Sequence, residues 1–207
     1  MQLTVRSHTR GFSLVEVLVA LVVISIGLLG IAKMQALALS NTNGGRLRAL
    51  AAIEAASLAA NMQAERNYWG NIPSALTINV VGTPGATAAT PGTSKITSSD
   101  TALSATAVTC TIPTGTSVGT CTGAVSCTST GTPCNAQKMA AYDLQQWAGR
   151  LQQLLGADAA LIACDIATAS SPVTCRITIN WSENQVNSTS TETGTMATPV
   201  YTLFVNP

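Results

Sequence analysis

The hydrophobic and polar positions of this chain divide it into four stretches of different character. The first is a nearly unbroken apolar run from Phe12 to Ala32. As a helix it would span about 32 Å, close to the bilayer hydrocarbon core of about 30 Å. Its Leu, Ile, Val and Phe side chains favour insertion by roughly 6 kcal/mol, against about 3 kcal/mol for its acidic residue, Glu16. We therefore expect residues 12–32 to form a transmembrane helix.

The second stretch, residues 33–68, has the apolar spacing of an amphipathic helix that continues from the first. Alanines between its larger side chains add helix propensity. The sequence Asn43-Gly44-Gly45 predicts a kink or a frayed turn, because two glycines cost roughly 2 kcal/mol within a helix. The residues near one stripe of this helix are Leu47, Leu50, Leu58 and Met62.

The third stretch, residues 71–133, is rich in Thr, Ser, Gly and Ala and contains several prolines. Short strands are expected at residues 76–81 and 107–112, and the rest is expected to be loop. Because such a composition buries little apolar area per residue, covalent links are expected to hold it.

The fourth stretch begins with residues 135–156, the clearest helix of a globular domain. Asn135 can cap its N-terminus and Gly156 can end it. Asp143 is expected on its surface and Trp147 in the core. The apolar stripe of this helix is Ala140, Leu144, Trp147, Leu151 and Leu154.

Strands are expected after this helix. Residues 159–166 are apolar, residues 173–181 alternate between apolar and polar positions, and residues 199–206 close the sheet. The alternating segment predicts a half-buried antiparallel strand. We therefore expect residues 69–207 to form a globular domain. The whole chain is expected to be an α+β protein, in which the long N-terminal helix packs on a small antiparallel sheet with an additional helix.

The sequence contains six cysteines, and an even number outside the cytoplasm indicates disulfides. Cys164 and Cys175 flank a Ser-Ser-Pro turn at a spacing that suits a bridge across a hairpin. A zinc site is the alternative, but the cysteines contain no CxxC spacing, and the lone histidine, His8, precedes the apolar run. The other four cysteines are Cys110, Cys121, Cys127 and Cys134, and their pairing cannot be deduced.

The charge distribution argues against binding of nucleic acid. The formal net charge is +1, from ten basic and nine acidic side chains. Arg6 and Arg10 precede the apolar run, so the remainder carries eight basic against nine acidic side chains and has no basic excess. These two arginines favour a cytoplasmic N-terminus, although Lys33 beyond the run weakens the asymmetry. The globular domain is then expected to face outward, away from the cytoplasm.

Three interpretations of the N-terminus compete. One is a permanent membrane anchor with an incidental Glu16. Another is a secretory signal peptide cut after Ala38, although the run is longer than an ordinary apolar region of roughly 7–15 residues. The third rests on the segment "RGFSLVE", which resembles the type IV prepilin signature. It has a basic leader, Gly11 before the cut, Phe12 after it, and Glu16 as the fifth mature residue.

This resemblance implies a cleaved leader, residues 1–11, removed by the membrane-bound prepilin peptidase, and methylation of the new amine at Phe12. It further implies that the Glu16 carboxylate neutralises the amine of a neighbouring subunit in a filament core. An intramembrane carboxylate indicates function by default. An ion pair in a low-dielectric environment would select one docking register, because either partner left alone is strongly penalised.

The C-terminal half extends the resemblance. A cysteine-bearing loop, a helix with "DLQQW" and "LQQLLG", and a hairpin ending in "ITINW" look like the PilV family of type IV pilus minor pilins. This resemblance implies a pilin-like fold and a non-enzymatic subunit that primes or modifies pilus assembly. Its partners would be other pilins and the inner-membrane assembly machinery, and its location the inner membrane and then the pilus. The segment near Lys33 lacks the helix-breaking proline usual in major pilins, which fits a minor component.

Other functions remain open at this point. A minor pseudopilin of a type II secretion system shares the leader and the glutamate, and a secreted adhesin would follow from a cut after Ala38. An enzyme is disfavoured, because no nucleophile has a histidine base and no glycine-rich phosphate loop follows a strand. Asp158 and Asp165 are too scattered to predict a calcium site. We expect no cofactor and no resident metal.

Overall fold

The structure, a computed structural model, describes residues 13–83, 92–111, 120–123, 125–127, 134–155, 159–184 and 196–207. It divides into two compact units, Met1–Asn43 and Gly44–Pro207. The first contains the apolar part of helix α1, and the second contains the rest of that helix and the globular domain. The pilin-like α+β class expected from the sequence is confirmed.

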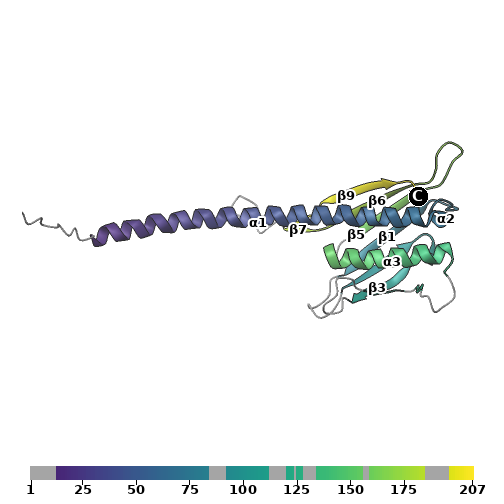
Figure 1. Ribbon diagram of the computed structural model, residues 1–207, viewed down its shortest axis with the longest axis horizontal. Coiled ribbons are helices and arrows are strands. Elements are labelled where there is room, and N and C mark those ends of the chain that lie inside the picture. Colours follow the sequence, from purple (N-terminus) through teal and green to yellow (C-terminus); the bar gives the residue numbers. More distant parts are fainter. Residues whose placement is uncertain are drawn as a thin grey trace, which may run out of the picture. The chain divides into compact units, whose positions relative to one another are not determined.

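Helix α1 runs from Leu14 to Ala64 (Figure 1), and the short helix α2 (Arg66–Trp69) follows it. The expected kink or frayed turn at Gly44-Gly45 is wrong, because α1 has no break there. The next turns of the helix bury Ala51, Ala55 and Leu58 in the core of the second unit. Burial of this face outweighs the roughly 2 kcal/mol that the two glycines cost.

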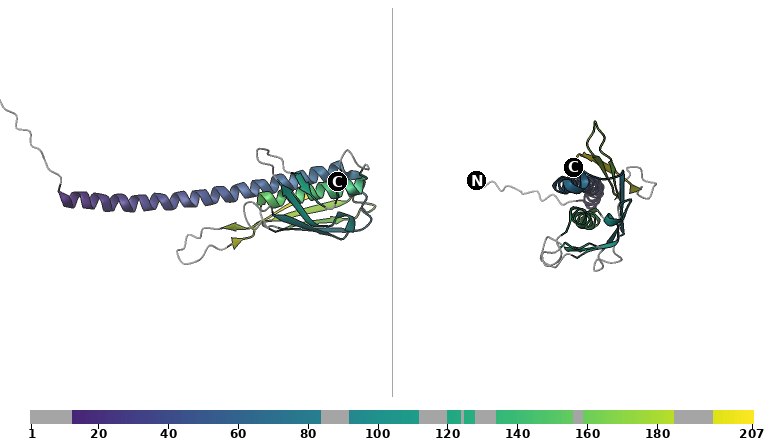
Figure 2. Two further views of the ribbon diagram at one scale, coloured as in Figure 1. Left: turned by 90° about the horizontal axis from the view of Figure 1, so that it is seen from below. Right: turned by 90° about the vertical axis from the view of Figure 1, so that its right-hand side faces the viewer.

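A seven-stranded sheet forms the body of the second unit, in the order β4-β3-β2-β1-β5-β6-β9, and every neighbouring pair is antiparallel. The strands of this sheet are β1 (Leu76–Thr83), β2 (Thr93–Ser98), β3 (Ala105–Thr111), β4 (Thr120–Thr122), β5 (Ala159–Asp165), β6 (Thr174–Asn180) and β9 (Val200–Val205). A separate pair, β7 (Glu183–Asn184) and β8 (Met196–Ala197), follows β6. Residues 44–64 of α1 and helix α3 (Ala136–Leu155) lie on one face of the large sheet (Figure 2).

The described part of residues 71–133 corrects the expectation of a region that is mostly loop. The two expected strands exist as β1 and β3, but β2, β4 and the 3-10 helix η1 (Thr101–Leu103) were not expected. In β2, Ser94 and Ile96 point into the core while Lys95 and Thr97 are exposed. The β-branched threonines suit a pleated, half-buried surface, so this polar segment forms a strand although its composition suggests a loop.

Helix α3 is capped as the sequence predicts, since the backbone N–H of Lys138 donates to Oδ1 of Asn135 at 2.9 Å. Its expected stripe is confirmed as far as Leu151. Leu154, however, is 41 % exposed, and Leu155 is buried in its place. The reason is the helical repeat. Leu155 lies four residues after Leu151 and therefore faces the core on the same side of the helix.

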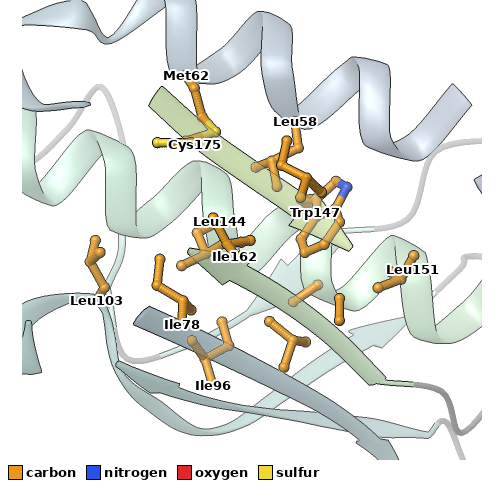
Figure 3. Packing of buried hydrophobic residues seen from close by; sticks show 14 of the residues in the cluster. Leu58, Met62, Ile78, Ile96, Leu103, Leu144, Trp147, Leu151, Ile162 and Cys175 are labelled. Atoms are coloured by element: carbon orange, nitrogen blue, oxygen red, sulfur yellow. The ribbon is translucent and has the colours of Figure 1, made fainter. Parts of the chain in front are cut away.

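The core fills the space between the two helices and the sheet. Figure 3 shows Leu58 and Met62 of α1 facing the sheet beside Trp147 of α3. Trp147 is fully buried, and its indole N–H donates to the backbone oxygen of Glu54 at 2.9 Å. The expected alternation in β6 is confirmed, since Cys175, Ile177, Ile179 and then Trp181 are buried.

Candidate assembly site in the N-terminal helix

The described part of the first unit, residues 13–43, is helical from Leu14 onward, with its apolar side chains on the outside. From Leu14 to Ile31 the large aliphatic side chains are all about half exposed or more. A window of this helix has a mean hydropathy of 2.8, and none of that window is buried. By length and composition the helix is able to cross a membrane. Such an apolar surface requires lipid or other apolar helices around it, because water solvates it poorly.

Two hydroxyl side chains on this helix satisfy their own hydrogen bonding. Ser25 Oγ donates to the backbone oxygen of Leu21 at 2.7 Å, and Thr42 Oγ1 donates to that of Ala38 at 2.9 Å. These bonds to the preceding turn remove the need for water or for a partner side chain. The hydroxyls are therefore compatible with an apolar environment.

Glu16 differs from these hydroxyls. It lies in the first turn of α1, where its own backbone N–H donates to the oxygen of Ser13 at 3.0 Å. Its carboxylate has neither a hydrogen bond nor an ion pair with any residue that the structure describes. The partial positive charge of a helix N-terminus favours a carboxylate there. Gly11 and Phe12, which the sequence places beside it at a cleavage point, lie outside the described residues.

Comparison with known proteins identifies this segment. Residues 6–32 match the family model of the prokaryotic N-terminal methylation motif, a range that includes Gly11, Phe12 and Glu16. The chain carries a type IV pilin-like prepilin signal. No curated protein and no solved structure matches the chain significantly. The signal indicates processing by a prepilin peptidase and assembly with pilins, in a pilin or a pseudopilin.

The cysteines of the second unit form disulfides. Cys164 is bridged to Cys175, which faces it directly across β5 and β6, and Cys127 is bridged to Cys134. Cys121 is also disulfide-bonded, and Cys110 lies opposite it in the register of β3 and β4. A bridged sulfur is not a thiolate, so these five cysteines are not zinc ligands in this state.

Three glutamines of α3 bind backbone groups of the Thr-rich region, and this role could not be read from the sequence. Gln146 donates to the backbone oxygen of Cys121 at 2.8 Å and accepts from its N–H at 3.3 Å. Gln145 accepts from the backbone N–H of Val125 at 3.2 Å. Gln152 donates to the oxygen of Thr83 at 3.2 Å. The "LQQ" pairs therefore hold strand ends and loops against the helix.

Buried carboxylates of the second unit connect elements of the fold. Glu54 of α1 lies 3.8 Å from Nε of Arg150 on α3 and accepts a hydrogen bond from Ser57. Burial raises the pKa of Glu54, while the charge of Arg150 and the bond from Ser57 lower it. The described contacts of the Glu54 carboxylate are Arg150 and Ser57 and include no histidine. Its partners are those of a structural ion pair.

A second acidic group, Asp100, joins α2, η1 and α3. Its Oδ2 accepts from the phenol of Tyr68 at 2.6 Å and from Gln137 at 3.0 Å. Its Oδ1 accepts from the backbone N–H of Ala102 at 3.0 Å. Burial acts to raise the pKa of Asp100, but the bonds from Tyr68, Gln137 and Ala102 hold it below its ordinary value. Burial and Asp100 raise the pKa of Tyr68, so the phenol stays protonated and donates.

Glu183 of β7 forms an ion pair with helix α1. Its Oε1 accepts from the indole N–H of Trp181 at 2.8 Å and lies 3.5 Å from Nε of Arg48. A Cβ added at Gly44 would lie 3.3 Å from Oε2 of the same carboxylate. Gly44 therefore leaves room for the Glu183 carboxylate. The sequence alone suggested that this glycine would help to break the helix, but in the structure it has this local packing role.

Proposed function

We propose that this protein is a minor pilin of the type IV pilus, similar to the PilV family, and that it primes or modifies pilus assembly without enzymatic activity. One observation carries the proposal. A prepilin signal at residues 6–32 overlaps the start of a helix whose large aliphatic side chains are all exposed from Leu14 to Ile31, with Glu16 in the first turn. Such a helix requires other helices or lipid on every side.

The proposed route begins at the inner membrane. The prepilin peptidase cuts between Gly11 and Phe12, and the amine of Phe12 is methylated. The helix anchors the protein by a single pass, with the globular unit in the periplasm. The assembly machinery then transfers the helix into the filament core, where the Glu16 carboxylate meets the Phe12 amine of a neighbouring subunit. In a low-dielectric core this pair is sensitive to register.

Mass spectrometry of the mature N-terminus tests the processing step. The expected first residue is Phe12, carrying a methylated amine. Gly11→Val should block cleavage, because a β-branched side chain prevents the close approach of the backbone that glycine allows. A mature protein that begins at Leu39 would show ordinary signal peptidase cleavage and would refute the pilin proposal in favour of a secreted adhesin.

The role of Glu16 is tested by comparing Glu16→Leu and Glu16→Asp with the parent. The measurement is the ratio of protein in sheared pili to protein in membranes. Glu16→Leu should be cleaved normally but depleted from pili, because an unpaired buried charge costs roughly 3–5 kcal/mol, equivalent to two to four decades in an association constant. Glu16→Asp should give an intermediate ratio, since the charge remains but its reach is shorter. An unchanged ratio in Glu16→Leu would mean that the carboxylate has no assembly role.

A minor pseudopilin of a type II secretion system would carry the same prepilin signal. Deletion of the gene separates the two functions. A minor pilin is expected to be required for normal piliation, whereas a pseudopilin is expected to be required for export of secreted proteins. Loss of export with normal piliation would assign the chain to the secretion system.

A further inference from the structure

The two edges of the seven-stranded sheet differ in how well they are protected against pairing with another strand. At one edge, β4 has three residues, and its central residue, Cys121, is disulfide-bonded. The side-chain amide of Gln146 binds both the N–H and the oxygen of Cys121, as a neighbouring strand would do. This edge is therefore short, cross-linked and capped by a side chain, which are features that prevent pairing with another chain.

The strand at the other edge is β9 (Figure 1). It has six residues, and within the described part of the chain it has neither a disulfide nor a side chain bonded to its backbone. It pairs with β6 over six residues, from Val200 to Val205, without a bulge. Beyond this ladder, residues 200–205 make no backbone hydrogen bond to any other described residue. The strand contains no charged residue and no proline. Natural proteins usually protect an edge of this length and composition, because its free N–H and C=O groups recruit further strands.

Exposure of the side chains supports an open edge. On the outer face of the sheet, Val200 is 60 % exposed and Phe204 is 66 % exposed. On the inner face, Tyr201 and Leu203 are only partly buried, whereas Ile177 of the adjacent β6 is fully buried. Apolar side chains on both faces of β9 therefore remain available to a neighbour that extends the sheet.

We propose that the free edge of β9 binds an extended segment of a partner protein, which adds to the sheet as its next strand. Only an extended backbone can bond to alternating N–H and C=O groups along a strand. Apolar residues on the added segment would lie beside Val200 and Phe204 on the outer face. Cross-strand pairs of aromatic and β-branched side chains are favourable in this position.

The charge next to this edge specifies the partner further. Arg176 on β6 lies directly opposite Phe204, and its side chain is exposed on the outer face. Arg176 makes no ion pair within the described part of the chain, not even with Asp165 on β5. An added strand would lie about 10 Å from β6, which a long arginine and an acidic side chain can span together. The partner segment is therefore extended, apolar at alternate positions, and acidic near Arg176.

Residue-resolved amide hydrogen exchange on the full-length protein tests this proposal. The protein purified in detergent is compared with the protein in membranes and in sheared filaments of the producing cells. In detergent, every second amide between Val200 and Val205, which points away from β6, should exchange fast. In the assembled states these alternate amides should slow by about tenfold or more, because each gains a hydrogen bond. Equal exchange in all states would overturn the proposal.

Matched variants show whether the edge itself binds. Thr202→Lys places a charge on the outer face of β9, and Thr77→Lys makes the same change on β1, which is paired on both sides. The first should abolish the alternate protection, whereas the second should leave it intact. Arg176→Glu should weaken the protection without altering β9, which covers the case in which Thr202→Lys fails to fold. Equal effects of the two lysine variants would contradict strand addition.

The outcomes separate this inference from the proposed function. Protein that is present in filaments with an unprotected β9 would refute strand addition and leave the minor-pilin proposal standing. Protein that is absent from filaments but protected at alternate amides in membranes would support strand addition and refute the minor-pilin proposal.

Discussion

The bridge between Cys164 and Cys175 should stabilise the second unit more than the bridge between Cys127 and Cys134. The sequence separations are 11 and 7 residues, so loop entropy predicts similar contributions of about 2.8 and about 2.5 kcal/mol. The two bridges differ, however, in how deeply they are buried. Cys164 is 2 % exposed and Cys175 is 0 % exposed, whereas Cys127 and Cys134 are only partly buried. Each sulfur removed from the core should cost about 1 kcal/mol more.

We therefore expect a loss of about 4–5 kcal/mol when Cys164 and Cys175 are both replaced by alanine, and about 2.5 kcal/mol for the other pair. The assay is urea unfolding of full-length protein in detergent without reductant, followed by fluorescence of the buried Trp69, Trp147 and Trp181. Equal losses for the two double variants would refute the contribution assigned to burial.

Three further predictions concern single side chains. Burial, together with the charge of Glu65, raises the pKa of Asp143, although Arg150 lowers it. A raised pKa in the folded state means that stability is lost as pH rises from the ordinary aspartate pKa of about 4 through the higher folded-state value. Asp143→Asn should therefore flatten the fall in the unfolding midpoint over this rise in pH. Gly45→Ala should raise the free energy of unfolding by about 0.5–1 kcal/mol in urea titrations, because a Cβ there meets no atom within 4 Å, and a lower midpoint would contradict it. Gly123→Ala should destabilise by about 1–3 kcal/mol, because its Cβ would overlap the amide of Gln145, and a double-mutant cycle with Gln145→Ala should recover part of that loss.

The features that could be predicted from the sequence depend on neighbours along the chain. The capped helix α3 and the alternating strand β6 have strong local periodicity, and both lie within a few residues of the expected bounds. The prepilin signal is also local, because a peptidase recognises it as a short segment before any tertiary structure is needed. The approximate extent of the exposed apolar helix follows from composition alone.

The features that were missed depend on contacts between distant segments. The strand β2 is polar in sequence, but Ile96 and Ser94 face the core, and Ser94 donates to the backbone oxygen of Ala148 at 2.9 Å. The helix continues through Gly44-Gly45 because the turns that follow are buried against other elements.

The sequence by itself determined the prepilin signal, the apolar helix and the elements with regular periodicity, because each depends on interactions within one segment or with its solvent. The tertiary structure decided that the buried stripe of α3 ends at Leu155 and not at Leu154. It also decided which backbone groups the glutamines of α3 bind and which sheet edge is left open. Strand order determines the open edge, and strand order results from the packing of segments far apart in the chain. A local pattern specifies that a strand forms, but its neighbours are chosen by the burial and hydrogen bonding of the whole domain.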